Sequence, residues 1–105
     1  MKFFQKIFGS ARTTDLKNAI QQGAFLVDVR TPAEFAQDHV KGTVNIPLDK
    51  IPDQLSQFKG RKNIIVFCLS GGRSSMAKSI LEKNGITCVI NGGTMKQVNR
   101  LLTGT

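Results

Sequence analysis

The amino-acid sequence predicts an α/β domain in which helices cover both faces of a parallel β-sheet. Apolar runs rich in Val and Ile alternate with segments of helical periodicity, which is the pattern of strand–helix–strand units. The strongest run, Asn63 to Cys68, is continuous and apolar, as in a strand buried on both sides. The chain has 105 residues, enough for one hydrophobic core, so we expect a single domain over residues 1–105.

The N-terminal part is expected to hold an amphipathic segment at residues 1–12, with the core at about 13–103. A first helix is predicted to end at Gly23, because Leu16, Ala19 and Ile20 before it fall on one helical face. A buried strand is predicted at residues 25–29.

A short helix is predicted to start at Thr31-Pro32-Ala33-Glu34. Thr31 and Glu34 have the spacing of a capping box, and Pro32 suits the first helical position. We expect this helix to end between His39 and Gly42. The remaining elements are expected to be an extended piece at 43–46, an amphipathic helix at 51–58, a strand at 63–68, a helix from Arg73 to about Asn84 that buries Met76, Ile80 and Leu81, a strand at 86–90, a loop at 91–93, and a helix capped by Thr94 that runs to about Leu102.

The loop after the strongest strand carries the clearest chemical signal. Cys68 stands at the carboxyl end of that strand, where open α/β sheets bind ligands, and a glycine-containing turn follows it into a helix. Backbone N–H groups in such a turn, the helix N-terminus and the charge of Arg73 all stabilise a thiolate. The pattern favours a reactive thiol at the floor of an anion pocket over the alternative, a small apolar residue that ends a core strand.

Four other residues were candidates for a role near this loop. Asp28 and Arg30 flank the end of the first strand, and we expect them to support the site through structural pairing, with Arg30 bound to Glu34. His39 is expected to be a hydrogen-bonded structural residue rather than a general base. Cys88 is expected to be an inert, buried thiol in the middle of a strand rather than a resolving cysteine.

Five motifs in order resemble those of the rhodanese family. Cys68-Leu69-Ser70-Gly71-Gly72-Arg73-Ser74 is similar to the C-x-x-G-x-R-S active-site loop of that family. The other four elements are Asp28-Val29-Arg30 followed by Glu34-Phe35, then Asp38-His39-Val40, then Gly42 with Asn45-Ile46-Pro47, and finally Gly92-Gly93. Together they span residues 28–93, most of the chain.

The resemblance implies a rhodanese-like three-layer sandwich with a five-stranded parallel sheet, and it implies sulfur transfer. Cys68 would be catalytic and would carry a sulfane sulfur as a persulfide between a donor such as thiosulfate and a thiophilic acceptor. The substrate-binding residues would be Leu69, Ser70, Gly71, Gly72 and Arg73, with Leu69 offering no side-chain donor to a thiosulfate oxygen. The implied partners are a small anionic sulfur donor and a thiol, cyanide or protein acceptor, with no metal and no cofactor.

Two alternative functions remain open at this point. A dual-specificity phosphatase of the cell-division-cycle type shares the fold but needs C-x5-R, whereas Cys68 to Arg73 is C-x4-R. A non-catalytic or sulfur-relay interaction module is the second alternative, although inactive rhodanese domains usually lack the loop cysteine that this chain keeps.

The composition limits the remaining function classes. The net charge of +8 comes from scattered basic residues, so we expect no specific nucleic-acid binding. No apolar run approaches the roughly 20 residues of a membrane-spanning helix, so we expect no stable membrane insertion. We expect a cytoplasmic protein (periplasmic if a signal peptide has been removed) that is a monomer or a weak dimer.

Overall fold

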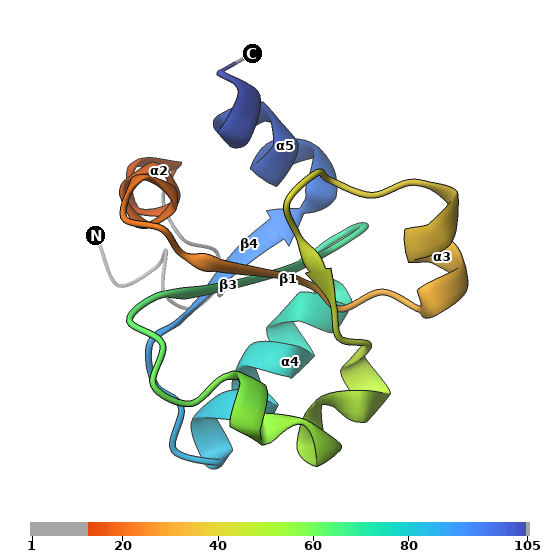
Figure 1. Ribbon diagram of the computed structural model, residues 1–105, viewed down its shortest axis with the longest axis vertical. Helices are drawn as coiled ribbons and strands as arrows, with labels where there is room; N and C mark the ends of the chain where they lie inside the picture. The colour runs from red at the N-terminus through yellow and green to blue at the C-terminus, as the bar shows by residue number, and fades with distance from the viewer. Residues whose placement is uncertain (1–12, 105) are drawn as a thin grey trace.

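Four parallel strands form the centre of the molecule in the computed structural model, which describes residues 13–104 (Figure 1). The strand order is β2-β1-β3-β4, and every neighbouring pair is parallel. The strands are β1 (Phe25–Asp28), β2 (Val44–Asn45), β3 (Ile64–Cys68) and β4 (Val89–Thr94). The described residues thus contain one strand fewer than the five expected, because the part of the chain from 13 to 104 holds only four extended apolar segments.

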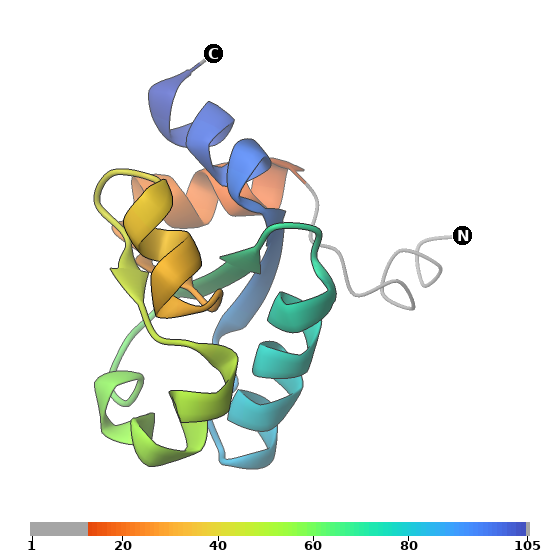
Figure 2. The same cartoon turned by 90° about the vertical axis from the view of Figure 1, so that its right-hand side faces the viewer.

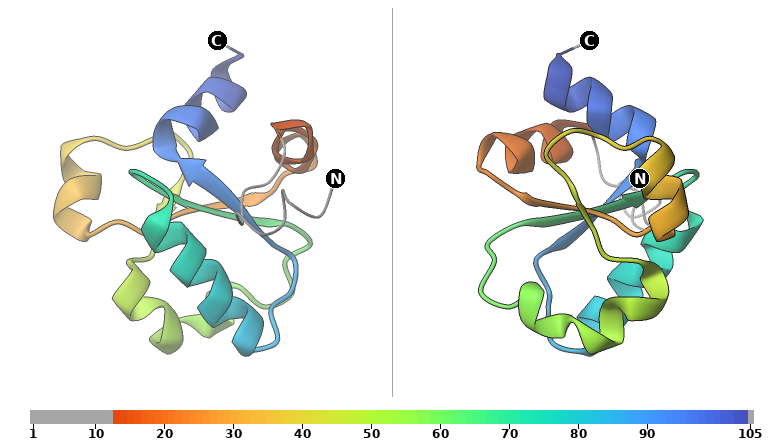
Figure 3. Two further views of the ribbon diagram at one scale, coloured as in Figure 1. Left: turned by 180° about the vertical axis from the view of Figure 1, so that it is seen from behind. Right: turned by 45° about the vertical axis from the view of Figure 1, so that its right-hand side comes forward.

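Helices cover both faces of this sheet, which confirms the expected three-layer architecture (Figure 2). One face carries α2 (Thr13–Gln21) and α5 (Met95–Thr103), and the other carries α4 (Gly72–Lys83) and the 3-10 helices η1 (Leu48–Asp53) and η2 (Leu55–Gln57). The short helix α3 (Pro32–Gln37) lies beyond the end of β1. Figure 3 shows α4 from behind, running beneath β4 with its first turn next to the end of β3.

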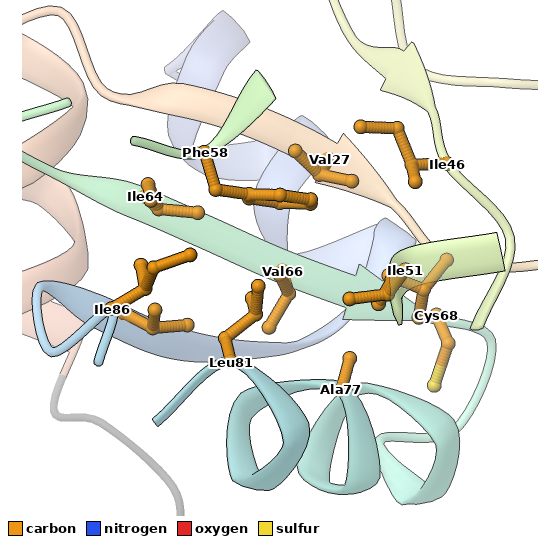
Figure 4. Close-up of a cluster of buried hydrophobic side chains, with 12 residues drawn as sticks. Val27, Ile46, Ile51, Phe58, Ile64, Val66, Cys68, Ala77, Leu81 and Ile86 are labelled. Carbon is orange, nitrogen blue, oxygen red and sulfur yellow. The ribbon is translucent and has the colours of Figure 1, made fainter. Parts of the chain in front are cut away.

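Strand β3 divides the core into two layers because successive side chains point to opposite faces. Ile64, Val66 and Cys68 pack in the layer on the α4 side, together with Ala77 and Leu81 (Figure 4). The alternate residues of β3 pack in the second layer, under α2 and α5, with Leu16 and Val98. All five residues of the strand are fully buried, so Cys68 is anchored as a core residue at the end of the sheet.

The capping box of α3 is confirmed. The hydroxyl of Thr31 accepts a hydrogen bond from the N–H of Glu34 at 3.2 Å, and Glu34 Oε1 accepts one from the N–H of Thr31 at 3.0 Å. Pro32 occupies the first helical position, and the helix ends at Gln37, slightly before the expected range. Thr94 is likewise confirmed as the cap of α5, since its hydroxyl accepts from the N–H of Gln97 at 3.1 Å.

Three expectations about secondary structure were wrong. The helix expected at 51–58 is replaced by η1 and η2. Helical structure begins at Leu48, so Pro52 lies past the first turn and has no N–H to donate to the carbonyl of Leu48 in an α-helix. The last strand begins at Val89 and continues through the expected loop to Thr94, pairing with β3 as far as Cys68. Met76 is 58% exposed, and the buried stripe of α4 consists of Ser74, Ala77 and Leu81.

The amphipathic segment expected at residues 1–12 lies outside the described residues. None of the helices within residues 13–104 is long and apolar enough to cross a bilayer.

Candidate functional site

The loop between β3 and α4 wraps closely around the side chain of Cys68. Cys68 ends β3, and α4 starts only four residues later, at Gly72. The turn is made by Gly71, whose φ of +101° is a conformation that side chains with a Cβ rarely adopt. A Cβ at Gly71 would lie 3.8 Å from the Cα of Gly93, so this loop also packs against the end of β4.

Hydrogen-bond donors converge on the sulfur of Cys68. The N–H of Gly71 donates to Sγ at 3.0 Å, and the hydroxyl oxygen of Ser74 lies 3.6 Å from Sγ. Burial raises the pKa of the Cys68 thiol. Hydrogen bonds from the Ser74 hydroxyl and from the backbone N–H groups of Ser74, Gly71 and Ser70 lower it by a larger amount, so the pKa is below its ordinary value. The site therefore favours the thiolate, the nucleophilic form of cysteine.

The thiol does not lie on an open pocket floor. Cys68 has no exposed surface, whereas the side chain of Leu69 is 59% exposed above it. The N–H of Gly71 points at the sulfur itself.

Arg73 is bound to a carboxylate in this structure. Its Nη1 and Nη2 donate to Oε1 and Oε2 of Glu34 at 2.6 and 3.0 Å, which is a bidentate ion pair between α4 and α3. The Arg73 hydrogen bonds, helped by the N–H of Thr31, lower the pKa of Glu34 to about 2. The expected pair between Arg30 and Glu34 is wrong, because Arg73 occupies this carboxylate.

Arg30 pairs instead with Asp28, two residues before it. Nη2 of Arg30 lies 2.7 Å from Asp28 Oδ2, and Nε lies 3.0 Å from both carboxylate oxygens. The same Nη2 donates to the carbonyl of Asp38 at 2.7 Å, so the pair ties the end of β1 to the end of α3. Both side chains are buried, at 0% and 6% exposure, which makes this ion pair a structural support beside the loop.

Two residues that were not among the expected site residues complete the surroundings of Cys68; Asn91 was expected to be first a turn residue and only second part of the pocket lining. Ser74 is fully buried in the first turn of α4, and Asn91 in β4 is 6% exposed. The Ser74 hydroxyl donates to Asn91 Oδ1 at 2.7 Å. Two features of the sequence could have identified these residues: Ser74 ends the loop motif, and Asn91 is a polar residue directly after the apolar pair Val89-Ile90.

The other candidates lie apart from this loop. His39 stacks on the ring of Phe35, and its Nδ1 is 2.8 Å from the carbonyl oxygen of Phe35. Cys88 is only partly buried and precedes β4, so the expectation of a buried thiol in mid-strand was wrong. Its S–H donates to the carbonyl of Arg61 at 3.1 Å.

Cys88 is too far from Cys68 to act as its resolving cysteine. The carbonyl of Cys88 accepts from the N–H of Ile64 at the start of β3, and Cys68 ends that strand. Val89 pairs with Ile64, so Cys88 is level with Asn63, five residues before Cys68; at about 3.3 Å per residue the two cysteines are about 16 Å apart. A disulfide requires Cα atoms within about 7 Å. A surface cavity of about 320 Å³ lies at the Cys88 end of the sheet and is lined by Phe58, Lys59, Gly60, Arg61, Asn84, Gly85, Ile86, Thr87 and Cys88.

Within residues 13–104, no group of three or more His, Cys, Asp or Glu side chains is placed to hold a metal ion. The site therefore consists of one acidified thiol, its hydroxyl and amide donors, and two ion pairs at its border.

Comparison with known proteins finds a matching family model and several similar chains. The family model of the rhodanese-like domain matches residues 12–99. The thiosulfate sulfurtransferase PspE of Escherichia coli (strain K12) is 38% identical over 74 residues, which cover 69% of this chain and 71% of that protein. The chloroplastic thiosulfate sulfurtransferase 16 of Arabidopsis thaliana is 38% identical over 96 residues, covering 80% of each chain. A solved structure of a rhodanese with anions from E. coli is 36% identical with a TM-score of 0.64, covering 71% of this chain and 91% of that one.

Proposed function

The chain belongs to the rhodanese-like domain family, and from this premise we propose that it is a sulfurtransferase that carries sulfane sulfur on Cys68. The observation that supports this role is the set of groups around the sulfur of Cys68: the Gly71 N–H donates to it, and the Ser74 hydroxyl, which accepts from the thiol, can turn to donate to the thiolate. These donors stabilise the thiolate, and no comparable set surrounds Cys88 among the described residues, where the sulfur donates to a carbonyl instead.

The proposed reaction has two displacement steps. The Cys68 thiolate attacks the outer sulfur of thiosulfate, a new S–S bond forms, and the S–S bond of the donor breaks to release sulfite. The persulfide then gives its outer sulfur to cyanide or to an acceptor thiolate, and the electron pair of the breaking bond returns to Cys68 as thiolate. The loop amides would stabilise the negative charge of both the thiolate and the persulfide.

The donor has to gain access to a buried sulfur. We propose that residues 69 and 70 swing outward for this step, because both are exposed. Gly71 is held more firmly, since its N–H donates to the sulfur and its carbonyl accepts from Ser74 and Ser75. Leu69 adds an apolar, exposed side chain to the loop and Arg73 is already paired, so a singly charged or neutral persulfide would be accommodated at least as well as doubly charged thiosulfate.

A second candidate is favoured by the complete burial of Cys68. A sulfur-relay or interaction module would keep its thiol covered and would expose it only when a protein partner displaced the loop. In this case small donors would not load the thiol, although a protein persulfide would.

The deciding experiment is the intact mass of the protein after incubation with thiosulfate. The sulfurtransferase proposal expects a gain of one sulfur atom, roughly 32 Da, that cyanide removes. The gain should persist in Cys88→Ser and disappear in Cys68→Ser. No gain with thiosulfate, but a gain with a protein persulfide donor, would replace the enzyme proposal with the relay module.

A further inference from the structure

The hydroxyl of Ser74 has more acceptors than protons. Its oxygen lies 2.7 Å from Asn91 Oδ1, 3.0 Å from the carbonyl of Gly71 and 3.6 Å from the sulfur of Cys68. A hydroxyl has one hydrogen to donate and two lone pairs that accept. The single Ser74 proton is therefore shared among three possible acceptors, and a proton donated to Asn91 Oδ1 or to the Gly71 carbonyl is not available to the sulfur of Cys68.

The side chain of Asn91 is fixed in its position as an acceptor. Its Oδ1 also accepts the N–H of Gly93 at 2.9 Å, and the residue is 6% exposed. Val66 pairs with Asn91 and Phe67 pairs with Gly93, so Gly92 is an extra residue in β4 that forms a β-bulge. The bulge lies next to the Cys68 loop, and Asn91 lies on the α4 side of the sheet, where it meets Ser74.

The two protonation states of Cys68 require two directions of the Ser74 hydroxyl. When Cys68 is a thiol, its S–H donates to Ser74 and the Ser74 hydroxyl donates to Asn91. When Cys68 is a thiolate, the hydroxyl must turn to donate to the sulfur, and Asn91 loses this bond while it keeps the N–H of Gly93. Asn91 thus competes with the thiolate for a single proton.

We propose that Asn91 is a positioning residue that sets how much of Cys68 is thiolate at neutral pH by holding the hydroxyl of Ser74. An effect of Asn91 on turnover rests on the proposed role of Cys68 as nucleophile, whereas an effect of Asn91 on the pKa of Cys68 does not. Asn91 stabilises the thiol form of Cys68 by holding the Ser74 proton, whereas the Gly71 N–H stabilises the thiolate form. The two contacts act on the pKa of Cys68 in opposite directions.

The charged groups around Cys68 stay the same in the alanine variants, Asn91→Ala and Ser74→Ala. They are Asp28 and Arg30 at the end of β1, Glu34 on α3 and Arg73 on α4, and they form two closed ion pairs. Strand β4 contains no charged residue, and the charged residues of η1, Asp49, Lys50 and Asp53, are exposed.

The test is a titration of the Cys68 thiolate by its absorbance near 240 nm in a Cys88→Ser background. The chain contains no Tyr and no Trp, so no phenolate overlaps this signal, and the measurement does not require a reagent to reach the buried sulfur. Asn91→Ala should lower the pKa of Cys68 by about half to one unit, the contribution of one neutral hydrogen bond. Asn91→Asp should raise it, because a carboxylate holds the hydroxyl proton more strongly.

The decisive comparison repeats Asn91→Ala in a Ser74→Ala background. Ser74→Ala alone should raise the pKa, and the further change at Asn91 should then have no effect. An unchanged pKa in folded Asn91→Ala, or a shift that survives in Ser74→Ala, would overturn the inference. If Asn91→Ala does not fold, Asn91→Asp supplies a second test: its increase in the Cys68 pKa should be smaller in the Ser74→Ala background, whereas an equal increase would be purely Coulombic and would contradict the inference. If thiosulfate loads Cys68 with sulfur but Asn91 has no effect on the Cys68 pKa through Ser74, only the role of Asn91 is rejected. If Asn91 has this effect but thiosulfate does not load Cys68, only the proposed enzyme is rejected.

Discussion

The carboxylate of Glu34 accepts two hydrogen bonds from the guanidinium of Arg73, at 2.6 and 3.0 Å, across 39 positions of the sequence. The same Oε1 atom accepts the N–H and the hydroxyl of Thr31 at 3.0 Å each, which closes the capping box of α3. One carboxylate therefore fixes both the start of α3 and the first turn of α4, the turn that also positions Ser74. A substitution of Glu34 should therefore change both the stability of the protein and the position of the Cys68 loop.

Removing the charge of Glu34 should give a pH-dependent loss of stability. The pKa of Glu34 is lowered to about 2, so its stabilising contribution is present above the ordinary value of 4.5 and is lost as the pH falls toward 2. The melting temperature of Glu34→Gln should be below wild type near neutral pH, and the two should converge on acidification. Glu82→Gln is the matched control, because the Glu82 carboxylate is 46% exposed and only 4.0 Å from Lys78 Nζ. If the melting temperature of Glu34→Gln stayed below that of wild type by the same amount down to acidic pH, the charge of Glu34 would contribute nothing to stability.

Replacing Arg73 should reduce sulfur transfer from thiosulfate, because the loss of its bonds to Glu34 leaves an unpaired carboxylate near the loop that repels the anionic donor. Loss of a charged hydrogen-bonding partner is worth roughly 1.5–3 kcal/mol, or about one to two decades in kcat/KM. Arg73→Lys should recover little of this loss, because an ammonium group cannot reproduce two parallel bonds to Glu34. Steady-state kinetics with thiosulfate and cyanide measures both variants. An unchanged kcat/KM in Arg73→Ala would mean that Arg73 serves only to join α3 and α4.

The buried pair of Asp28 and Arg30 should be a major contributor to stability. Arg30→Ala would leave the fully buried carboxylate of Asp28 without its partner, and breaking such a pair costs about 3–5 kcal/mol. Denaturant unfolding of Arg30→Ala should show this decrease in the free energy of unfolding. Arg100→Ala removes an exposed arginine from α5 and should change stability by less than about 0.5 kcal/mol. Equal effects of the two variants would contradict the structural role of Arg30.

Local patterns were sufficient for most of the fold but for only part of the site. The cap at Thr31, the buried strand that ends in Cys68 and the glycine turn at Gly71 each depend on neighbours within a few residues, and each was visible in the sequence. The pairing of Arg73 with Glu34 depends on how α3 and α4 pack, so the nearer Arg30 was the wrong choice. The β-bulge at Gly92 shifts the register of β4, which is why a predicted loop turned out to be a strand that carries Asn91 toward Ser74.

Gly92→Ala should destabilise the protein through steric overlap alone. The backbone of Gly92 does not have a positive φ, but an added Cβ would lie 2.8 Å from Cγ2 of Ile65 and 3.1 Å from Cγ2 of Val98. Both neighbours are fully buried, and overpacking of this kind costs about 1–3 kcal/mol. Gly72→Ala is the control for stability, since nothing lies within 4 Å of its Cβ position and alanine favours the helix that begins there. Denaturant midpoints that are equal for the two variants would contradict the prediction.

The last prediction concerns the length of the loop between Cys68 and Arg73. The C-x4-R ring is small enough for the N–H of Gly71 to reach Sγ at 3.0 Å while Arg73 binds Glu34 and Ser74 binds Asn91. Since α4 is held by these last two bonds, a residue inserted between Gly72 and Arg73 would enlarge the loop and draw Gly71 away from the sulfur. A displacement of about 1 Å at a reacting group can cost about 100-fold in rate.

We therefore expect the insertion to depress sulfur transfer from thiosulfate to cyanide, while the larger ring accepts a tetrahedral oxyanion and reveals slow hydrolysis of aryl phosphates. The unmodified protein should show negligible phosphate hydrolysis in the same assay. Rapid hydrolysis by the unmodified protein that disappears in Cys68→Ser would mean that a four-residue loop does not exclude phosphatase chemistry in this fold.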